Sequence, residues 1–243
     1  MTLKSIKYEK LMKLITDKKI PLVICDYDIF KQNLEKLGRL LKENRKFMRL
    51  CTKSVRVPEL VKYVEQQEYV NGIFAFNSAE VLFYAKEYHI KDILLGYPVY
   101  SEIDAEELCQ AAKVEGVTVT VMVDNINHVK LLETHAKANN VDLNLLVEID
   151  VSYRFLGQTV GVLRSPLKKK NEILQLAEAI ENVDNLSLRG IMGYEAQNAS
   201  LGDDKFLYRW VKSKSRKYVN AMRHDIVNTL IEAGYTIDVV NGG

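Results

Sequence analysis

Short apolar runs recur along the chain, and a longer amphipathic segment follows almost every one of them. The runs are rich in Val, Ile and Leu, which is typical of strands that are covered on both faces. We predict strands at residues 21–27, 47–51, 72–76, 92–96, 117–123, 143–149, 186–192 and 236–240.

The segments between these runs carry helix-start signals. In "NSAEVLFYAKEY", Asn77 lies three residues before Glu80, which is the capping-box spacing. Pro58 suits the first turn of a helix through "PELVKYVEQQ", and Ser101 is a suitable cap for "SEIDAEELCQAAK". The stretches "DNINHVKLLETHAKANN" and "NEILQLAEAIENV" are also amphipathic, so we predict helices there.

Strict strand–helix alternation favours a parallel α/β architecture. No GxGxxG follows the first strand, so a dinucleotide-binding fold has little support. A TIM-type (β/α)8 barrel fits better, although counting from residues 47–51 gives seven barrel strands rather than eight. We therefore expect a single α/β barrel domain over residues 1–243, with 1–28 as a leading segment and strand, truncated before its last strand.

An irregular stretch, "DVSYRFLGQTVGVLRSPLKKK", interrupts the alternation after the run at 143–149. A connection of this length at the end of a barrel strand is usually functional or disordered.

Composition narrows the functional classes. The net charge of +2 offers no global argument for binding nucleic acid or a membrane. The three cysteines form no CxxC pattern, which disfavours a disulfide framework or structural zinc. No apolar run is long enough for a transmembrane helix, and the lysine-rich N-terminus lacks the core of a signal peptide. We predict a cytoplasmic protein.

One basic segment offers a rival function. Residues 205–223 hold seven Lys and Arg, no acid and several aromatic residues, a combination that can bind nucleic acid. The nearly neutral chain favours instead an amphipathic helix with a solvated basic face.

Reactive groups of TIM barrels lie just past the C-terminal ends of the strands. The groups in that position are Thr52-Lys53, Asn77-Ser78, Tyr97-Pro98, Asp124, Asp150 with the loop carrying Arg154 and Arg164, "GYEAQN" at 193–198, and Asn241-Gly242-Gly243. A lysine there can form a Schiff base, glycines let backbone N–H groups approach a phosphate, and a tyrosine hydroxyl can bond a ring nitrogen. Together they make a workable site for pyridoxal 5′-phosphate (PLP).

Other titratable residues have simpler interpretations. Glu148 and Asp150 share a strand face and can pair with Lys53 or an arginine, as a salt bridge or in catalysis. His128 and His135 lie seven residues apart on a predicted helix, a spacing that does not suit a metal pair, so we predict surface histidines.

At these residues the chain resembles a known family. The order of "PLVICDYDIFKQNLEKL", "MRLCTKSVRVPELV", "VEIDV", "IMGYEAQ" and "VVNGG" resembles that of fold-type III PLP enzymes. Within them it is similar to the D-threonine aldolase and D-serine dehydratase branch, from about Ile20 to Gly243. The resemblance implies a barrel like the N-terminal domain of alanine racemase, an amino-acid substrate, and a homodimer.

The resemblance also implies roles for residues. Lys53 would hold the cofactor as a Schiff base and act in catalysis, and Tyr194 would lie near the pyridine nitrogen. The cofactor's phosphate would meet the segment Asn241, Gly242 and Gly243. Of the two loop arginines, Arg164 fits the family spacing better than Arg154.

Two departures from the family pattern bear on activity. Gln197 stands where the family's "GYEGH" motif has histidine, and the C-terminal β-domain that holds the family's divalent metal is absent, so we predict no metal site. We expect a PLP-dependent lyase, an aldolase or a dehydratase (deaminase), acting on a 3-hydroxy D-amino acid. An amino-acid racemase or a non-catalytic PLP-binding fragment is the alternative. The neutral Tyr194 favours elimination or aldol cleavage over racemisation.

Overall fold

The computed structural model describes residues 8–155, 157–200 and 202–242. The chain divides into two compact units, Met1–Lys46 and Phe47–Gly243, and each is described by itself. None of the described helices is both long and apolar enough to span a membrane.

The first unit consists of helices α1 (Tyr8–Ile15) and α2 (Tyr27–Glu43). Helix α2 begins at Tyr27 because the carboxylate of Asp26 accepts a hydrogen bond from the Ile29 N–H at 3.1 Å. The predicted strand at 21–27 is wrong: residues 22–26 are irregular, and Val23 is 99% exposed. A strand needs a hydrogen-bonded neighbour, and no strand of the described residues pairs with this segment.

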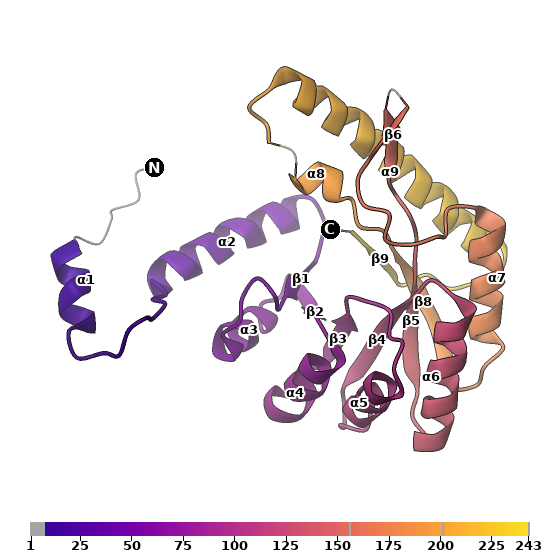
Figure 1. Ribbon diagram of the computed structural model, residues 1–243, viewed down its shortest axis with the longest axis horizontal. Coiled ribbons are helices and arrows are strands. Elements are labelled where there is room, and N and C mark those ends of the chain that lie inside the picture. Colours follow the sequence, from indigo (N-terminus) through magenta and orange to yellow (C-terminus); the bar gives the residue numbers. More distant parts are fainter. Residues whose placement is uncertain (1–7, 156, 201, 243) are drawn as a thin grey trace. The chain divides into compact units, whose positions relative to one another are not determined.

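The second unit is built on a seven-stranded parallel sheet, which confirms seven of the predicted strands (Figure 1). In the order in which they pair, the strands are β1 (Met48–Cys51), β2 (Val70–Ala75), β3 (Asp92–Leu95), β4 (Thr118–Val123), β5 (Leu143–Glu148), β8 (Leu186–Met192) and β9 (Val239–Asn241). At the last pair Gly190 is required, because its φ is +152° and a Cβ atom there would lie 1.9 Å from the Val239 carbonyl oxygen.

Helices cover the outer side of this curled sheet (Figure 1). They are α3 (Pro58–Glu65), α4 (Ser78–Tyr88), α5 (Glu102–Ala112), α6 (Ile126–Asn139), α7 (Lys170–Glu181) and α9 (Phe206–Glu232), while the short helix α8 (Ala196–Ser200) lies beyond the strand ends, beside α9 (Figure 1). Their buried aliphatic faces pack on the outward side chains of the strands in one large core. The α/β fold of TIM type is therefore confirmed, with β1 and β9 as the edges of the sheet in the described residues. The single barrel domain over residues 1–243 stays a prediction.

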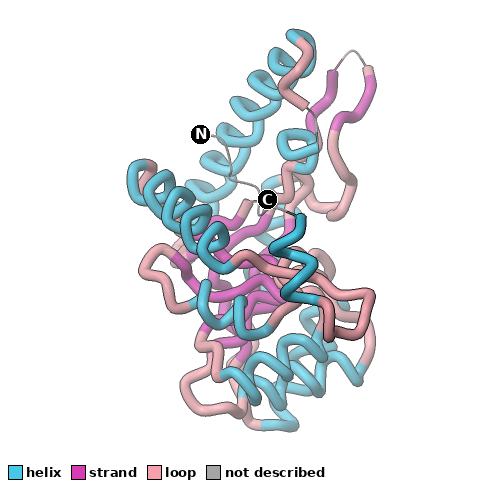
Figure 2. Tube along the Cα trace, turned by 90° about the vertical axis from the view of Figure 1, so that its left-hand side faces the viewer, coloured by secondary structure: helices cyan, strands magenta, loops and turns pink. Residues whose placement is uncertain are grey.

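The irregular stretch after β5 contains an element that the sequence did not indicate. Strands β6 (Tyr153–Phe155) and β7 (Gln158–Val160) form an antiparallel hairpin that stands beside the first half of α9 (Figure 2). Ring contacts fix this arrangement, since Tyr153 packs on Tyr218 and Phe155 on Trp210. Strands of three residues are too short for an alternating pattern to be recognised. The predicted basic helix is confirmed as part of α9, and most of its basic side chains are exposed.

The concave side of the sheet is filled in layers, because every second residue of a strand faces it. The lowest layer is ionic: Asp92 of β3 accepts hydrogen bonds from Arg49 of β1 at 2.6 Å and from Arg189 of β8 at 2.7 Å. Arg189 also donates to the hydroxyl of Thr120 at 2.9 Å. Strands β1 and β8 are not neighbours in the sheet, so Asp92 joins them across its concave side.

An apolar layer lies above this ionic layer. Side chains of four strands form it: Leu94, Met122, Leu146 and Met192, with Phe74, Tyr194 and Val239 packed against them. Two residues further along, β4 and β5 bring Asp124 and Glu148 to the C-terminal mouth of the sheet. Asp124 and Glu148 therefore lie at the mouth, directly above the apolar layer.

Replacing Asp92 should test the ionic layer. Burial alone would raise the pKa of Asp92, but hydrogen bonds and charges from Arg49 and Arg189 outweigh it and hold the pKa below its ordinary value. Asp92→Asn leaves two largely buried arginines unpaired, so we expect a loss of about 3 kcal/mol in unfolding free energy, measured by urea denaturation. The variant should show this full difference from the parent protein above about pH 5, and the difference should shrink below about pH 4. A carboxyl group with a lowered pKa stabilises the folded state only while it is ionised.

The matched control is Asp203→Asn, since Asp203 pairs with Lys212 but is 73% exposed on its side chain. We expect that change to cost less than about 1 kcal/mol. Equal losses for Asp92→Asn and Asp203→Asn would contradict the ionic-layer assignment.

Candidate active site

A pocket of about 410 Å³ opens at the C-terminal mouth of the sheet. Its walls are Lys53, Tyr97, Pro98, Tyr100, Asp124, Glu148, Arg164 and Tyr194. Three of the predicted site residues, Lys53, Arg164 and Tyr194, are therefore brought together from segments far apart in the sequence. The size is within the range of small-molecule sites, roughly 300–1,000 Å³.

Lys53 occupies the turn that follows β1. The Thr52 N–H continues the strand ladder by donating to the Phe74 carbonyl at 3.0 Å, and the Ser54 N–H closes the turn on the Cys51 carbonyl at 3.0 Å. Thr52 is buried, whereas Lys53 is exposed at the lip of the pocket. Its amine has no hydrogen-bond or ion-pair partner among the described residues, which leaves it available for a ligand.

Arg164 reaches the pocket because the long loop after β5 folds back onto its own start. The Ser165 hydroxyl donates to the Glu148 carbonyl at 2.6 Å, and the Asp150 N–H donates to the Leu167 carbonyl at 2.8 Å. These bonds place Arg164 directly beside Glu148. Arg154, the other candidate, is exposed on β6 and does not line the pocket.

The guanidinium of Arg164 is held on several sides. Its Nε lies 2.8 Å from Glu148 Oε1, and its Nη2 donates to the Gly96 carbonyl at 2.8 Å. The same group lies 4.8 Å from the ring centre of Tyr97 and 5.4 Å from that of Tyr194. Such stacking between two rings leaves Arg164 with one orientation.

Glu148 is the more deeply buried of the two acids that line this pocket. Its burial raises the pKa of the carboxyl group, Arg164 lowers it, Asp124 raises it, and the net shift is upward. The sequence allowed Glu148 and Asp150 to pair with Lys53 or an arginine. Glu148 pairs with Arg164, while Asp150 pairs with Lys168 at 3.1 Å and supports the loop.

Tyr194 follows β8, and its neighbour Glu195 ties this turn to helix α9. Arg223 of α9 donates to Glu195 Oε1 at 2.9 Å and also bonds the Gly193 carbonyl. A Cβ atom on Gly242 would lie 2.9 Å from Arg223 Nη2, so only glycine fits here without displacing that side chain.

The remaining predicted phosphate residues lie beside this turn rather than in the pocket wall. The Asn241 carbonyl accepts from the Gly193 N–H at 3.1 Å, which places the end of β9 next to the residue before Tyr194. Neither Asn241 nor Gly242 lines the pocket of Lys53. Gly243 lies outside the described residues.

Gln197 faces away from the pocket. Its amide donates to the Val151 carbonyl at 3.0 Å, and a Cβ atom on Gly161 would lie 2.6 Å from Gln197 Oε1. Gln197, which stands in place of the family's histidine, therefore ties α8 to the segments that flank the β6–β7 hairpin.

The prediction of His128 as a surface histidine is wrong, since it is only 3% exposed. Its Nδ1 lies 3.1 Å from Asp124 Oδ1, and the ring of Tyr100 packs edge-on against it. His128 lines a second pocket of about 430 Å³ that shares Tyr100, Asp124 and Arg164 with the first. The amphipathic pattern correctly placed His128 and His135 on one helix, but their spacing did not reveal that His128 is buried against a pocket.

The sequence placed Tyr97 and Asp124 at strand ends without marking them as site residues, it predicted Glu148 only as a strand residue that can form an ion pair, and it gave no indication of Tyr100. Tyr100 lies three residues beyond Tyr97 on the same connection. A search for aromatic residues in the first turn after each strand would have found it.

The donor set fits PLP. An amine without a partner among the described residues, an arginine and three tyrosines surround a pocket of suitable size. The described residues hold no cluster of three or more His, Cys, Asp or Glu that could bind a metal, and the absence of a metal site stays a prediction.

Comparison with known proteins gives the family. Residues 25–234 match the family described as alanine racemase, N-terminal domain. The chain belongs to this family. The expected place among fold-type III PLP enzymes is thereby confirmed.

Two similar proteins are named as aldolases. This chain is 26% identical over 223 residues to a 3-hydroxy-D-aspartate aldolase of Paracoccus denitrificans (strain Pd 1222), covering 92% of the chain and 54% of that relative. A 3-hydroxy-D-aspartate aldolase of Paracoccus denitrificans is 26% identical over 182 residues, or 75% of the chain and 44% of the relative. The chain thus spans about half the length of the curated relatives it matches.

Solved structures of the same group share the fold. A D-threonine aldolase from Filomicrobium marinum superimposes with a TM-score of 0.81 at 20% identity, over 94% of this chain and 57% of that one. D-threo-3-hydroxyaspartate dehydratase from Delftia sp. HT23 gives a TM-score of 0.72 at 16% identity, over 93% and 55%.

Replacing Arg164 tests its ion pair with Glu148. Arg164→Ala leaves a buried carboxylate without its cation, so we expect a loss of about 3 kcal/mol in unfolding free energy at pH 7. The loss should shrink as the pH falls to about 5, because a carboxyl group whose folded pKa is raised gains stability by taking up a proton. Urea denaturation at the two pH values measures both effects.

Arg154→Ala is the matched control, since Arg154 lies exposed on β6 in the same loop. It should change the unfolding free energy by less than about 0.5 kcal/mol. If both variants lose a similar amount of unfolding free energy, Arg164 does not stabilise the fold through Glu148.

Proposed function

We propose that this chain is the PLP-binding part of a lyase that acts on a D-amino acid with a 3-hydroxyl group. The observation that carries the proposal is the unpaired Lys53 amine at the mouth of a pocket whose far wall is Arg164 and Tyr194. The family match and the names of the aldolase and dehydratase relatives support it.

Lys53 is the residue that would bind the cofactor covalently, because an amine forms a bond to a carbonyl carbon only when it is free and unprotonated. Bound PLP supplies an electron sink that weakens the bonds at the substrate's Cα atom. Arg164 presents positive charge to the anionic side of a ligand. The Tyr194 hydroxyl in the same wall offers a neutral hydrogen bond to a ring nitrogen.

The distribution of bases favours lyase chemistry over racemisation. A racemase has to move a proton on both faces of one carbon atom, which takes two available bases. Among the amine and carboxylate groups of this pocket, only the Lys53 amine has no partner in the described residues, because Glu148 contacts Arg164 and Asp124 contacts His128. One such base suffices for cleavage or elimination, whereas racemisation would also need one of the tyrosine hydroxyls of the pocket.

A homodimer, a cytoplasmic location and the absence of nucleic-acid binding stay predictions. For the last of these, α9 offers a specific observation: Lys212 and Arg223 are engaged with Asp203 and Glu195, so two of the seven basic groups in residues 205–223 are already neutralised.

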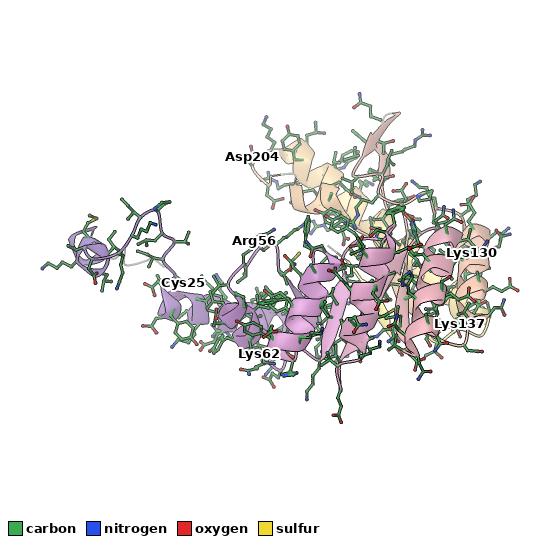
Figure 3. All side chains as sticks on the ribbon, turned by 60° about the horizontal axis from the view of Figure 1, so that its bottom comes forward. Cys25, Arg56, Lys62, Lys130, Lys137 and Asp204 are labelled. Atoms are coloured by element: carbon green, nitrogen blue, oxygen red, sulfur yellow. The ribbon has the colours of Figure 1, made fainter. Side chains whose placement is uncertain are left out.

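Replacing Lys53 tests the function most simply. The purified protein with added PLP should show the visible absorption of a lysine-bound pyridoxal, and Lys53→Ala should abolish it while leaving the unfolding free energy within about 0.5 kcal/mol. Lys130→Ala is the control, because Lys130 projects from the outer side of α6 with Lys137 (Figure 3).

Activity is then assayed on a panel of D- and L-amino acids with and without a 3-hydroxyl group. Cleavage or deamination of the D-3-hydroxy compounds alone supports the lyase. Exchange of the Cα proton without cleavage would favour a racemase, and a coloured protein inert on the whole panel would favour a non-catalytic PLP-binding protein.

A further inference from the structure

Glu80 does not complete the helix cap that its position suggests. Asn77 caps α4 as predicted, and its Oδ1 accepts from the Glu80 N–H at 2.8 Å. In a capping box the glutamate would reach back to the N–H of the cap residue. Glu80 Oε2 instead accepts from the N–H of Phe76, one residue earlier, at 3.0 Å.

The same oxygen atom has a second donor. The hydroxyl of Thr52 donates to Glu80 Oε2 at 2.5 Å, and the side chain of Thr52 is buried. Thr52 directly precedes Lys53, so one carboxylate oxygen joins the turn after β1 to the end of β2. Hydrogen bonds to a charged acceptor are about twice as strong as neutral ones.

The end of β2 leads on to the opposite wall of the pocket. The ring of Phe76 lies edge-on to the ring of Tyr97, with centres 5.5 Å apart. Tyr97 in turn carries the guanidinium of Arg164 at 4.8 Å. Glu80 is therefore linked to Lys53 on one side and to Arg164 on the other, although it does not line the pocket itself.

A purely structural role would need less than this. The helix already has its cap in Asn77, and the contact of Glu80 with Arg56 is long, at 3.9 Å, to a side chain that is 66% exposed. Such an exposed pair contributes little to stability. The further effect of these contacts is to fix the distance between Lys53 and the pocket wall that contains Arg164.

We propose that Glu80 is a positioning residue, which sets the Lys53 amine at bonding distance from a cofactor held by the Arg164 and Tyr194 wall. The inference rests on the proposed function, because it concerns the same amine. Glu80 acts through the Thr52 hydroxyl, so substitutions that remove either group should have the same effect.

The experiment uses the full chain in four variants: Glu80→Gln, Thr52→Val, Thr52→Ser and Glu133→Gln. Glutamine cannot supply a charged acceptor, and valine has the shape of threonine without its hydroxyl. Thr52→Ser keeps the hydroxyl and is the conservative rescue. Glu133→Gln is the matched control, since Glu133 pairs at 2.7 Å with the exposed Lys137 on the outer side of α6 (Figure 3).

Two quantities are measured: the half-saturating PLP concentration for borohydride-trapped Lys53, and amide hydrogen exchange over residues 52–55 and 76 without PLP. In Glu80→Gln and Thr52→Val we expect the half-saturating concentration to rise about tenfold and these amides to exchange about tenfold faster. Thr52→Ser and Glu133→Gln should resemble the parent protein. Thr52→Val decides alone if Glu80→Gln does not fold.

The proposal is overturned if the parent protein is trapped at Lys53 and both variants are trapped at the same PLP concentration. Faster exchange with unchanged trapping also overturns it, because Glu80 would then only stabilise a turn. If the parent protein is not trapped at Lys53 at all, the proposed function fails first, and the positioning role fails with it.

Discussion

Asp92 joins two arginines from strands that are not neighbours in the sheet, and this contact closes the lower end of its concave side. A carboxylate in this place is tolerated because both of its oxygens receive charged donors, and its lowered pKa records that the ionised form is favoured. The lower end of the concave side is closed in this way. The alternating direction of the side chains along each strand then determines the layers above it. The next inward residues form an apolar layer, and the ones after them reach the mouth.

At the mouth, position is set by contacts that come from outside the strands. Arg164 is brought in by a loop that folds back through Ser165, and it is then fixed by Glu148, Gly96 and two aromatic rings. Lys53 is set by a turn whose neighbour Thr52 is bonded to Glu80. Among the described residues the Lys53 amine has no partner while the groups around it do, and this difference supports the proposal that Lys53 is where the cofactor attaches.

The sequence was sufficient for the sheet and for part of the site, for reasons that differ by residue. Buried parallel strands are continuous apolar runs, so β2 to β5 and β8 could be predicted, and Lys53 and Tyr194 could be placed from their strand ends. The run at 21–27 had the same composition but no strand beside it. His128 and Glu80 were not foreseeable, because their roles depend on the side of a helix or on a bond between residues 28 apart. Arg164 could be preferred to Arg154 only by resemblance, and the loop bonds supply the physical reason.

The most direct test is to locate the lysine to which PLP becomes attached. The protein is incubated with one equivalent of PLP, reduced with borohydride, digested and mapped by peptide mass. We expect one phosphopyridoxyl group, found on the peptide that contains Lys53 and on no other. Label spread over exposed lysines such as Lys130 and Lys137, with none enriched at Lys53, would contradict attachment of the cofactor at Lys53.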